Sequence, residues 1–510
     1  MLDVARWRHN WAPGSGPGPA GSAVEPVVTP AEMGVIDAAA PEPVEVLIER
    51  AGWAVARAAL GLLGGTYGAR VLVLAGKGNN GNDGRVAARF LAARGVRCRV
   101  EVADFQPSPT DLARCDLVID AAYGTGFRGS WDAADVGSTP VLAVDIPSGV
   151  NGLTGEAAGR VLSAAATVTF AAWKPGLLFH PGRGLAGSVT VADIGLDART
   201  GCRAWHLSAN DLGPPLPEIA GLTRAQRESD LREAPQSAPD GWPQAGVEAH
   251  KWQRAVWVIG GHGSMLGAPS LAAAAAARAG AGYVALSVPG TTLSGPPVPV
   301  ESVIRPLPAR WGTDVVAEQA RFAALVVGPG LPIDLATQGD VLNVAANTST
   351  RGLVLDGGAL DAVASDPSIL RGRTVPAVLT PHDGELRRLL RGRIPGADRI
   401  DTVRRLAADL GAVVLAKGPT TVAAHPDGRV LVSTAGDQRL ASAGTGDVLA
   451  GLVGAGLAGG LEPLAAAGLA AELHGRAAHL GFHRGFVAGD LPLLVGRWLE
   501  AAGAPVGWQP

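Results

Sequence analysis

The chain of 510 residues contains little cysteine and no long apolar run. Its three cysteines, Cys98, Cys115 and Cys202, lie too far apart for a metal-binding spacing or a disulfide framework, so a reducing cytoplasm is the expected compartment. The longest Ala/Leu/Gly stretches, 270–282 and 448–461, are too short for a transmembrane helix. The first residues lack the continuous apolar stretch that a secretory signal needs. We therefore expect no membrane partner.

Charge excludes an electrostatic case for nucleic acid, because the formal net charge is −3 and only 17% of the residues are charged. Hydrophobic residues make up 47% of the chain, which suits a globular enzyme. Lysine is scarce, with four lysines against 39 arginines. In a chain this biased toward arginine, a retained lysine points to a special position. The four are Lys77, Lys174, Lys251 and Lys417.

Composition divides the chain into two α/β domains. Residues 1–27, rich in Gly and Pro, predict a disordered extension, and 213–249, rich in Pro, Gln, Ala and charge, predict a linker. Within 28–212 and 250–510, short apolar strands alternate with helical stretches, which predicts βαβ units and mostly parallel sheets. The predicted strands are 71–75, 97–103, 117–121, 141–146, 167–172, 189–194, 254–259, 283–288, 323–327, 352–355, 376–380 and 411–416.

Two local signals predict single elements. Thr29, Pro30 and Glu32 in VTPAEM predict the start of a helix with a capping box. Asp427 and Gly428 predict the turn of a hairpin within 421–434.

The loop after the first strand matches a dinucleotide-binding turn but is unusually polar. Gly76, Gly78 and Gly81 fit G-x-G-x-x-G, and Glu101 follows twenty residues after the last glycine. A loop that only brings its backbone to a phosphate needs no polar side chains, so this one indicates further chemistry. The polar residues are Asn79, Asn80, Asn82 and Asp83.

Two neighbouring strands end in acids. Asp120 is followed by AAYGTGFRGS (121–130), and Asp145 is followed by IPSG, which contains Ser148. Ligands of open α/β sheets bind at the carboxyl ends of the strands, so we expect these residues to converge with Asn80. Their oxygens suit a hard cation, and GTGFRGS suits phosphate. Taken singly, each acid could equally be a helix cap or a loop acid.

The second half carries ASAGTGDVLAG (441–451). Gly444, Thr445 and Gly446 at a helix start predict an anion hole of backbone N–H groups. Asp447 beside it could deprotonate a hydroxyl that attacks a phosphoryl group, or could simply cap the helix. The Gly-rich rim is completed by GGHGSMLGAPS (260–270), GPGLP (328–332), TPHDGE (380–385) and AKGPTT (416–421).

GNNGNDGRVAAR, DAAYGTGFRG, VDIPSGVNGLTG and TVTFAAWKPGL resemble the NAD(P)H-hydrate epimerase family over residues 28–212. That family has a Rossmann-like fold and interconverts the R and S hydrates of NADH and NADPH. The resemblance implies potassium at Asn80, Asp120 and Ser148, and Asp145 as substrate ligand and catalytic acid/base. Lys77 and Asn82 depart from the usual pattern. The implied substrate contacts are Asn79, Asn80, Gly81, Asn82, Asp83, Gly124, Thr125, Gly126, Phe127, Arg128, Gly129 and Ser130.

The motifs of residues 250–510 resemble the ADP-dependent NAD(P)H-hydrate dehydratases, which have a ribokinase-like fold, and both halves together resemble the bifunctional NAD(P)H-hydrate repair enzymes. The implied second reaction dehydrates the S hydrate while ADP becomes AMP and phosphate, with a magnesium ion and with Asp447 as base. Asp383, Pro332 and the HKW stretch at Lys251 depart from the usual pattern. The implied ADP contacts are Lys417, Gly418, Pro419, Thr420, Thr421 and Gly446. The implied hydrate contacts are Ala268, Gly330, His382 and Asp447.

Three functions stay open on these residues. The first is hydrate repair by a homo-oligomer that acts on ADP and on the hydrates of NADH and NADPH, which are called NADHX and NADPHX. The second is a ribokinase-like small-molecule kinase fused to an epimerase-like binding domain, and the third is a non-enzymatic binding scaffold. The acids at 120, 145 and 447 disfavour the scaffold. An ordinary dehydrogenase is disfavoured because no site for hydride transfer to an alcohol or acid substrate is visible.

Overall fold

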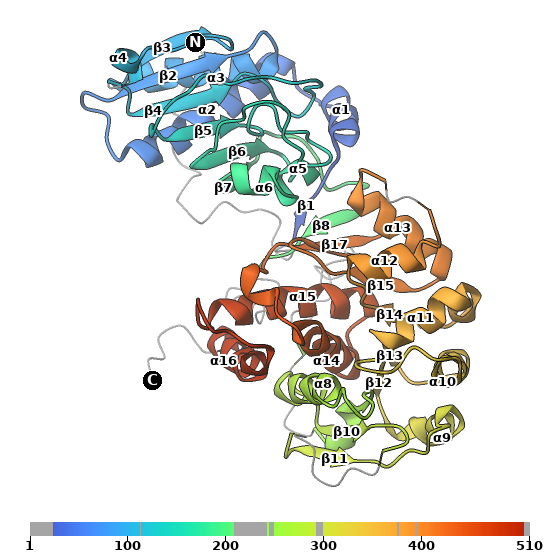
Figure 1. Cartoon of the computed structure of the whole chain (residues 1–510). Helices are drawn as coiled ribbons and strands as arrows, with labels where there is room; N and C mark the ends of the chain where they lie inside the picture. The colour runs from blue at the N-terminus through green and yellow to red at the C-terminus, as the bar shows by residue number, and fades with distance from the viewer. Residues whose placement is uncertain are drawn as a thin grey trace, which may run out of the picture.

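The protein folds into two α/β units, each built on its own sheet (Figure 1). The predicted α/β class with two domains is confirmed. Residues 1–23 of the predicted extension and most of the predicted linker 213–249 lie outside the described residues. The computed structural model describes residues 24–112, 114–208, 242–243, 249–291, 299–374, 377–393 and 396–503.

The first unit is a parallel sheet of six strands. Its strands are β2 (Arg70–Ala75), β3 (Arg97–Val102), β4 (Leu117–Ala121), β5 (Val141–Val144), β6 (Ala166–Phe170) and β7 (Ser188–Ala192), in the order β3-β2-β4-β5-β6-β7. All residues of β4 and β5 are buried, because both faces of the sheet are covered. One face packs on α2 and α3. The helices are α1 (Pro30–Ala38), α2 (Val44–Leu63), α3 (Asn79–Ala92), α4 (Pro109–Leu112), α5 (Pro175–Leu178) and α6 (Gly182–Leu185).

The second unit is a larger, mixed sheet. Its strands are β9 (Ala255–Ile259), β10 (Tyr283–Ser287), β11 (Ser302–Ile304), β12 (Ala324–Val327), β13 (Gly352–Leu355), β14 (Val378–Leu379), β15 (Val413–Ala416), β16 (Thr421–Ala424) and β17 (Val430–Ser433). Strands β9 to β15 are parallel in the order β15-β14-β13-β12-β9-β10-β11, and β16 and β17 add the predicted antiparallel hairpin.

Helices cover both faces of this sheet (Figure 1). One core contains α8 (Gly267–Arg278), α14 (Thr445–Ala458), α15 (Pro463–His479) and α16 (Leu491–Gly503). The opposite core contains α9 (Gly312–Glu318), α10 (Leu335–Asn347), α11 (Gly358–Ser365), α12 (Asp383–Leu389) and α13 (Arg399–Leu410). Short 3₁₀ turns occur at Lys251–Arg254, Gln319–Arg321, Pro367–Leu370, Gln438–Leu440 and Ala488–Asp490.

Two strands from the ends of the first unit extend the second sheet. Strand β8 (Ala204–His206) pairs with β17 in parallel, and β1 (Glu25–Pro26) pairs with β8. Residues 24–27, which the sequence placed in the disordered extension, are therefore ordered. Both strands are too short to show a hydrophobic period, which explains why the sequence does not predict them.

Part of the predicted linker also packs against the second unit. Trp242 is 7% exposed in the core beside α8, and its indole N–H donates to the Ala279 carbonyl at 2.9 Å. The first unit is joined to the second by sheet pairing and by packing, so the linker does not simply tether two separate bodies.

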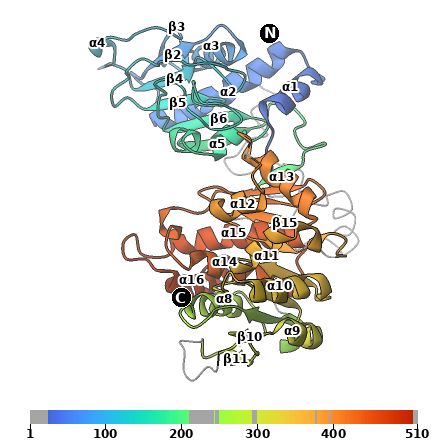
Figure 2. The same ribbon diagram turned by 45° about the vertical axis from the view of Figure 1, so that its right-hand side comes forward.

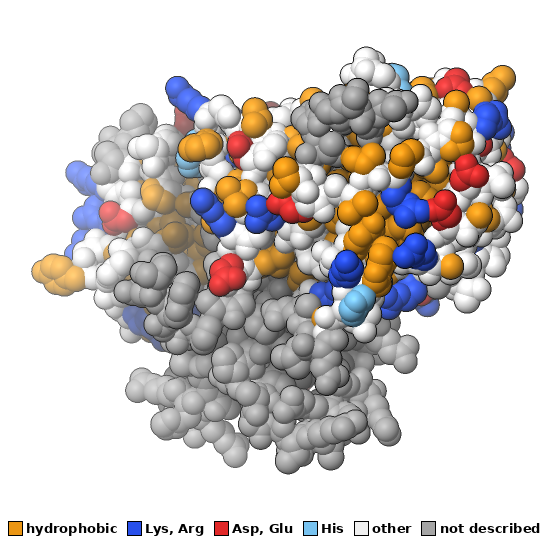
Figure 3. Space-filling model, turned by 90° about the horizontal axis from the view of Figure 1, so that it is seen from below, with side chains coloured by type: hydrophobic (Ala, Val, Ile, Leu, Met, Phe, Trp, Pro, Cys, Tyr) orange, Lys and Arg blue, Asp and Glu red, His pale blue; other side chains and the backbone are white. Residues whose placement is uncertain are grey.

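The surface carries charges of both signs. Figure 2 shows α5 at the edge of the first unit that faces the second. On the face shown in Figure 3, Lys/Arg and Asp/Glu side chains are interspersed with apolar ones. Among the described residues, no helix combines the length and the apolar character that crossing a membrane requires.

Candidate functional sites

The first site lies where β2 ends and α3 begins at Asn79. A Cβ atom on Gly81 would lie 2.0 Å from the Gly76 carbonyl oxygen, so only glycine fits there. Asn82 lies inside α3 with an ordinary φ, and Arg85 donates to its Oδ1 at 3.3 Å. The helix therefore accommodates this departure from the family pattern without a positive φ.

Asp145 follows β5 in an unusual backbone conformation. Its φ is +67°, a region that non-glycine residues seldom adopt. Its Oδ1 lies 3.0 Å from Lys174 Nζ and accepts from Thr169 Oγ1 at 3.2 Å, while Oδ2 accepts from the Thr125 N–H at 3.1 Å. Lys174 is 1% exposed and also donates to the Phe170 carbonyl at 2.7 Å. Strain held by surrounding contacts in this way is typical of functional sites.

Two carboxyl groups of this site have pKa values shifted in opposite directions. Burial acts to raise the pKa of Asp145, but the charge and hydrogen bond of Lys174 and the Thr125 contact outweigh it and hold the pKa below its usual range. Burial, reinforced by the charge of Asp145, raises the pKa of Asp83 to about 8. At neutral pH Asp83 is protonated and Asp145 is an anion. Such a pair is suited to act as acid and base.

The predicted cation ligands gather beside this pair. The Asp120 carboxylate is fully buried and accepts from the Ser148 hydroxyl at 2.6 Å and from its N–H at 2.9 Å. Burial raises the pKa of Asp120, against its hydrogen bonds. Asn80 Nδ2 is buried with no partner among the described residues. A Cβ atom on Gly124 would lie 3.1 Å from Asp145 Oδ2 and 3.4 Å from the Asn80 amide carbon, so both side chains border Gly124.

The loop after β4 reaches Asp145 only with its first residues. Thr125 makes the backbone contact, and Phe127 packs on Tyr123 with ring centroids 4.3 Å apart. Arg128 turns back to the carbonyl of Phe127 at 2.9 Å. The exposed remainder of the predicted substrate loop is Gly126, Arg128, Gly129 and Ser130.

The second site surrounds the start of α14. Gly444 precedes the helix at a φ of +92°, and a Cβ atom there would lie 2.6 Å from the Leu271 side chain of α8. Thr445 then begins a helix of 14 residues, whose first backbone N–H groups can bind an anion. A Cβ atom on Gly446 would lie 3.2 Å from Lys417 Nζ. The structure thus brings the predicted nucleotide lysine to the predicted anion hole.

Lys417 lies among three carboxyl groups. Its Nζ is 2.9 Å from Asp356 Oδ1 and 4.0 Å from Glu385 Oε2. Thr380 also donates to Asp356 Oδ1, at 2.7 Å. Burial and the Asp356 charge raise the pKa of Asp447 to about 7, with Glu385 adding to the effect and Lys417 opposing it. Asp447 therefore titrates near neutral pH, as a general base should.

His382 forms the N-cap of α12. Its Nδ1 accepts from the Gly384 N–H at 2.9 Å, and its own N–H donates to Glu385 at 2.8 Å, which completes a capping box. The ring is 59% exposed and remains open to a ligand at its outer edge. Asp383, another departure from the family pattern, lies 2.9 Å from Arg399, which compensates its charge.

The predicted hydrate residues of the Gly-rich rim also meet. Gly330 has a φ of +72°, and a Cβ atom on it would lie 3.1 Å from the Ala268 Cβ. By contrast, Lys251 precedes β9 at the amino end of the sheet, away from the strand ends that carry the site. The HKW departure therefore has no bearing on this site.

The predicted nucleotide loop is held by the first unit. The Thr420 side chain is 4% exposed and its hydroxyl donates to the Leu178 carbonyl. The Pro419 carbonyl accepts from Arg183 Nη1 at 2.8 Å. Because the Thr420 hydroxyl is engaged, any contact of this residue with a nucleotide would come from its backbone.

Sequence reasoning did not assign Lys174, Asp356 or Glu385 to a site. Lys174 was marked only as one of four rare lysines, of which Lys77 and Lys251 are exposed. Asp356 follows β13 as Asp145 follows β5, so the rule that acids at strand ends converge would have found it. Glu385 lies within the TPHDGE stretch as the partner of His382.

Both halves of the chain match known protein families. Residues 256–499 match the family described as NAD(P)H-hydrate dehydratase, and residues 44–114 and 101–176 match the family described as YjeF-related protein N-terminus. The solved structure of an ADP/ATP-dependent NAD(P)H-hydrate dehydratase from Bacillus subtilis, co-crystallised with ATP and Mg²⁺, is 27% identical. It matches 51% of this chain and 94% of its own, with a TM-score of 0.42.

Full-length relatives match as well. The bifunctional NAD(P)H-hydrate repair enzyme of Moorella thermoacetica is 34% identical over 91% of this chain and 95% of that protein. The enzyme of the same name from Mycobacterium leprae is 34% identical over 85% of this chain and 89% of that protein. The resemblance predicted from the motifs is thus confirmed, and the chain belongs to the family of bifunctional NAD(P)H-hydrate repair enzymes.

Proposed function

We propose that the chain epimerises the R and S hydrates of NADH and NADPH in its first unit. Its second unit then dehydrates the S hydrate to NAD(P)H while ADP becomes AMP and phosphate. The observation that carries the proposal is that each unit brings together a lysine-paired carboxylate and a second carboxyl group with a raised pKa. The pairs are Asp145 with Asp83 and Asp356 with Asp447.

Epimerisation inverts the ring carbon that carries the added hydroxyl. The hydroxyl leaves as water after receiving a proton from Asp83, and a water returns to the opposite face of the ring while Asp145 accepts its proton. One proton is given and one is taken, so the charge of the site is conserved. The ionised Asp145 also stabilises the positive ring between the two steps. The polar loop 79–83 and the loop 124–130 would hold the substrate.

Dehydration needs a better leaving group than hydroxide. Asp447 takes the proton of the substrate hydroxyl, whose oxygen attacks the β-phosphorus of ADP, and AMP leaves. Phosphate then departs from the ring carbon with its electron pair, a ring proton is lost, and the double bond reforms. Lys417 and the N–H groups at the start of α14 stabilise the transferred phosphoryl group. Residues 417–421 and Gly446 would hold ADP, and Ala268, Gly330 and His382 the hydrate.

Two metal ions fit the donors that are present. The described residues contain no group of three or more His, Cys, Asp or Glu side chains placed around one point. Potassium does not need such a group, and the oxygens of Asp120, Ser148 and the Asn80 amide would hold it. Magnesium commonly binds through one or two carboxylates plus phosphates, and Asp356 and Glu385 share a single ammonium. Magnesium would neutralise phosphate charge during transfer.

One assay tests the function. Purified protein receives mixed R and S hydrates with and without ADP, and recovery of the reduced cofactor is followed by absorbance. We expect full recovery with ADP and none without it. Accumulation of a phosphorylated product would favour the small-molecule kinase instead. The proposal keeps the expectation of a cytoplasmic homo-oligomer, whose assembly light scattering would measure.

A further inference from the structure

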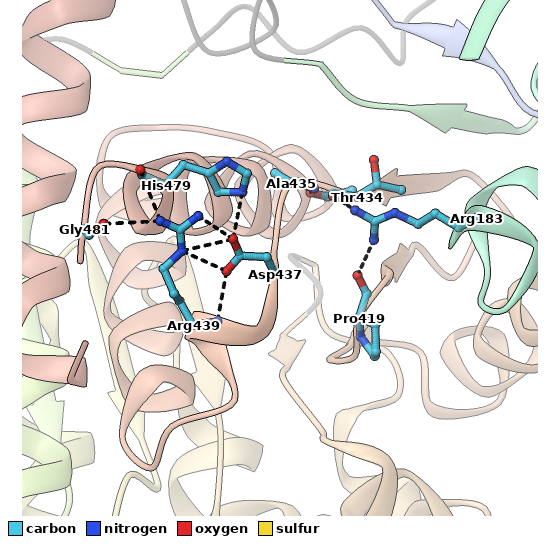
Figure 4. A network of polar contacts seen from close by, with 9 residues as sticks. Arg183, Pro419, Thr434, Ala435, Asp437, Arg439, His479 and Gly481 are labelled. Carbon is cyan, nitrogen blue, oxygen red and sulfur yellow. Dashed lines mark hydrogen bonds and ion pairs between the residues drawn. The ribbon is translucent and has the colours of Figure 1, made fainter. Parts of the chain in front are cut away.

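One short segment of the first unit lies between the two sites. It runs over residues 174–185 and includes α5 and α6. At its start, Lys174 Nζ is 3.0 Å from Asp145 Oδ1. At its other end, Arg183 Nη1 donates to the Pro419 carbonyl at 2.8 Å (Figure 4). The segment therefore contacts the proposed epimerase acid and the proposed nucleotide loop within a few turns of chain.

The segment is fixed to the first unit by backbone bonds. The Gly176 N–H donates to the Gly152 carbonyl, and the Gly182 N–H donates to the Gly155 carbonyl, each at 2.8 Å. Both acceptors lie in the loop that follows Ser148, one of the proposed potassium ligands. A shift of the segment would therefore be felt in the loops of the epimerase site.

The same segment is equally fixed to the second unit. Leu178 is fully buried within the core beneath β13 to β16, and its carbonyl accepts from the Thr420 hydroxyl. The second nitrogen of Arg183, Nη2, donates to the Thr434 carbonyl just beyond β17. The planar guanidinium thus bridges two carbonyls, one on the nucleotide loop and one just beyond the hairpin that follows it, with two donors held in a fixed geometry.

Thr434, one of the two carbonyl partners of Arg183, precedes a turn that is held by hydrogen bonds of its own. The turn that follows it contains Asp437, which pairs with Arg439, and Arg439 also donates to the carbonyls of His479 and Gly481 (Figure 4). These bonds tie the turn to the end of α15. Arg183 therefore joins the nucleotide loop to a turn that is held independently.

We propose that Arg183 is a positioning residue for the 417–421 loop, so that the nucleotide site of the dehydratase is complete only while the epimerase unit is docked against it. The inference rests on the proposed ADP site at this loop.

Full-length variants test the inference by calorimetric titration with ADP in the presence of Mg²⁺. Arg183→Ala should raise the Kd for ADP about tenfold, within the range typical of coupled sites, and Thr420→Val should raise it less. Arg183→Lys should restore part of the affinity. The matched control is Arg203→Ala, which removes another arginine–carbonyl bond between the units, from Arg203 Nη1 to the Asp427 carbonyl at 2.8 Å, but at the hairpin turn. It should leave the Kd unchanged.

Thermal unfolding separates positioning from general loosening. If Arg183→Ala and Arg203→Ala lower Tm alike but only the first raises the Kd, the positioning role holds. If both variants keep wild-type ADP affinity while Lys417→Ala loses it, the positioning inference is overturned and the ADP site stands. If Lys417→Ala also binds ADP like the wild type, the proposed ADP site itself is wrong.

Discussion

Each of the two units places one lysine near the strand ends, with Lys174 1% exposed and the Lys417 side chain 18% exposed, but only Lys174 pairs directly with the proposed catalytic acid. In the first unit, Lys174 pairs with Asp145 at 3.0 Å and holds its pKa low. In the second, Lys417 pairs with Asp356 at 2.9 Å, and Asp447 keeps a pKa raised to about 7. In each unit the ammonium thus pairs directly with one carboxylate, while burial raises the pKa of a second acid, Asp83 or Asp447.

The unpaired acids share a position as well as a pKa direction. Asp447 lies in the first turn of α14, and Asp83 is the fifth residue of α3, just beyond its first turn. A helix N-terminus favours the ionised form, yet both pKa values are raised, so burial and neighbouring carboxylates outweigh the helix dipole. The comparison teaches that each unit places a lysine-paired carboxylate near a second acid whose pKa is raised.

The largest expected effect is at Asp447. Asp447→Asn keeps the size of the side chain but removes the base, so dehydration should slow by about 10²–10⁴ while epimerisation persists. Rates of AMP and NADPH release measure this. The matched control is Asp398→Asn at the N-cap of α13, where a purely capping acid should cost at most about 1 kcal/mol of unfolding free energy. A rate within a few-fold of wild type would show that Asp447 is not the base.

Asp145→Ala should have the reverse effect on the two activities: epimerisation is lost and dehydration is kept. Epimerisation should fall by about 10²-fold or more because the ionised partner of Asp83 is lost. Dehydration of pure S hydrate should continue, since Asp447 lies in the other unit. Chromatographic separation of R and S hydrates over time gives the rate. Interconversion at the wild-type rate would contradict the acid–base pair.

Lys174→Met tests whether the ammonium sets the state of Asp145. The substitution leaves a buried carboxylate unpaired, so it should lower the unfolding free energy by about 3–5 kcal/mol and raise the pKa of Asp145. Lys77→Met removes an exposed lysine of the same unit and should change neither. Denaturant unfolding and the pH profile of epimerisation are the two measurements. Equal behaviour of both variants would refute the pairing.

The rates of the two activities should also change with pH in opposite directions. Asp447 must be ionised to act as base, so kcat/KM of dehydration should fall about tenfold per pH unit as pH drops below its pKa of about 7. Asp83 must be protonated to act as acid, so epimerisation should fall as pH rises above its pKa of about 8. Profiles of the two rates, measured separately, check both signs. If both rates changed with pH in the same direction, the proposed roles of Asp447 as base and Asp83 as acid would be wrong.

The smallest expected effect is at Asp383. Its charge is compensated by Arg399 at 2.9 Å, so Asp383→Asn should change ADP affinity by less than about threefold, as expected of an exposed ion pair. Arg399→Ala should weaken ADP binding more, because Arg399 also donates to the Lys417 carbonyl at 3.0 Å. Calorimetric Kd values for both variants decide this. A large gain in affinity from Asp383→Asn would show that the compensation fails.

The sequence by itself determined the local elements. The predicted strands coincide with β2 to β7 and with β9, β10 and β12 to β15 to within a few residues. The capping box forms as predicted, with Glu32 N–H donating to Thr29 Oγ1 at 3.2 Å, and the hairpin turns at Asp427 and Gly428. Hydrophobic period, capping and turn chemistry depend on neighbouring residues, so they can be read from the chain alone. The acids at the strand ends, such as Asp120 and Asp145, can also be identified from the chain alone.

Only the tertiary structure determined which distant residues contact one another and how the pKa values of the acids are shifted. The pairing of β8 with β17 and the contact of Arg183 with Pro419 join segments far apart in the chain, and no local period marks them. The sequence singled out Lys174 but could not assign it to Asp145, which lies on another strand end. The pKa of Asp83 is raised by burial, which belongs to the packed molecule. Topology and desolvation are properties of the folded chain, and they bring the polar motifs together into two clusters that each contain a lysine-paired carboxylate and an acid with a raised pKa.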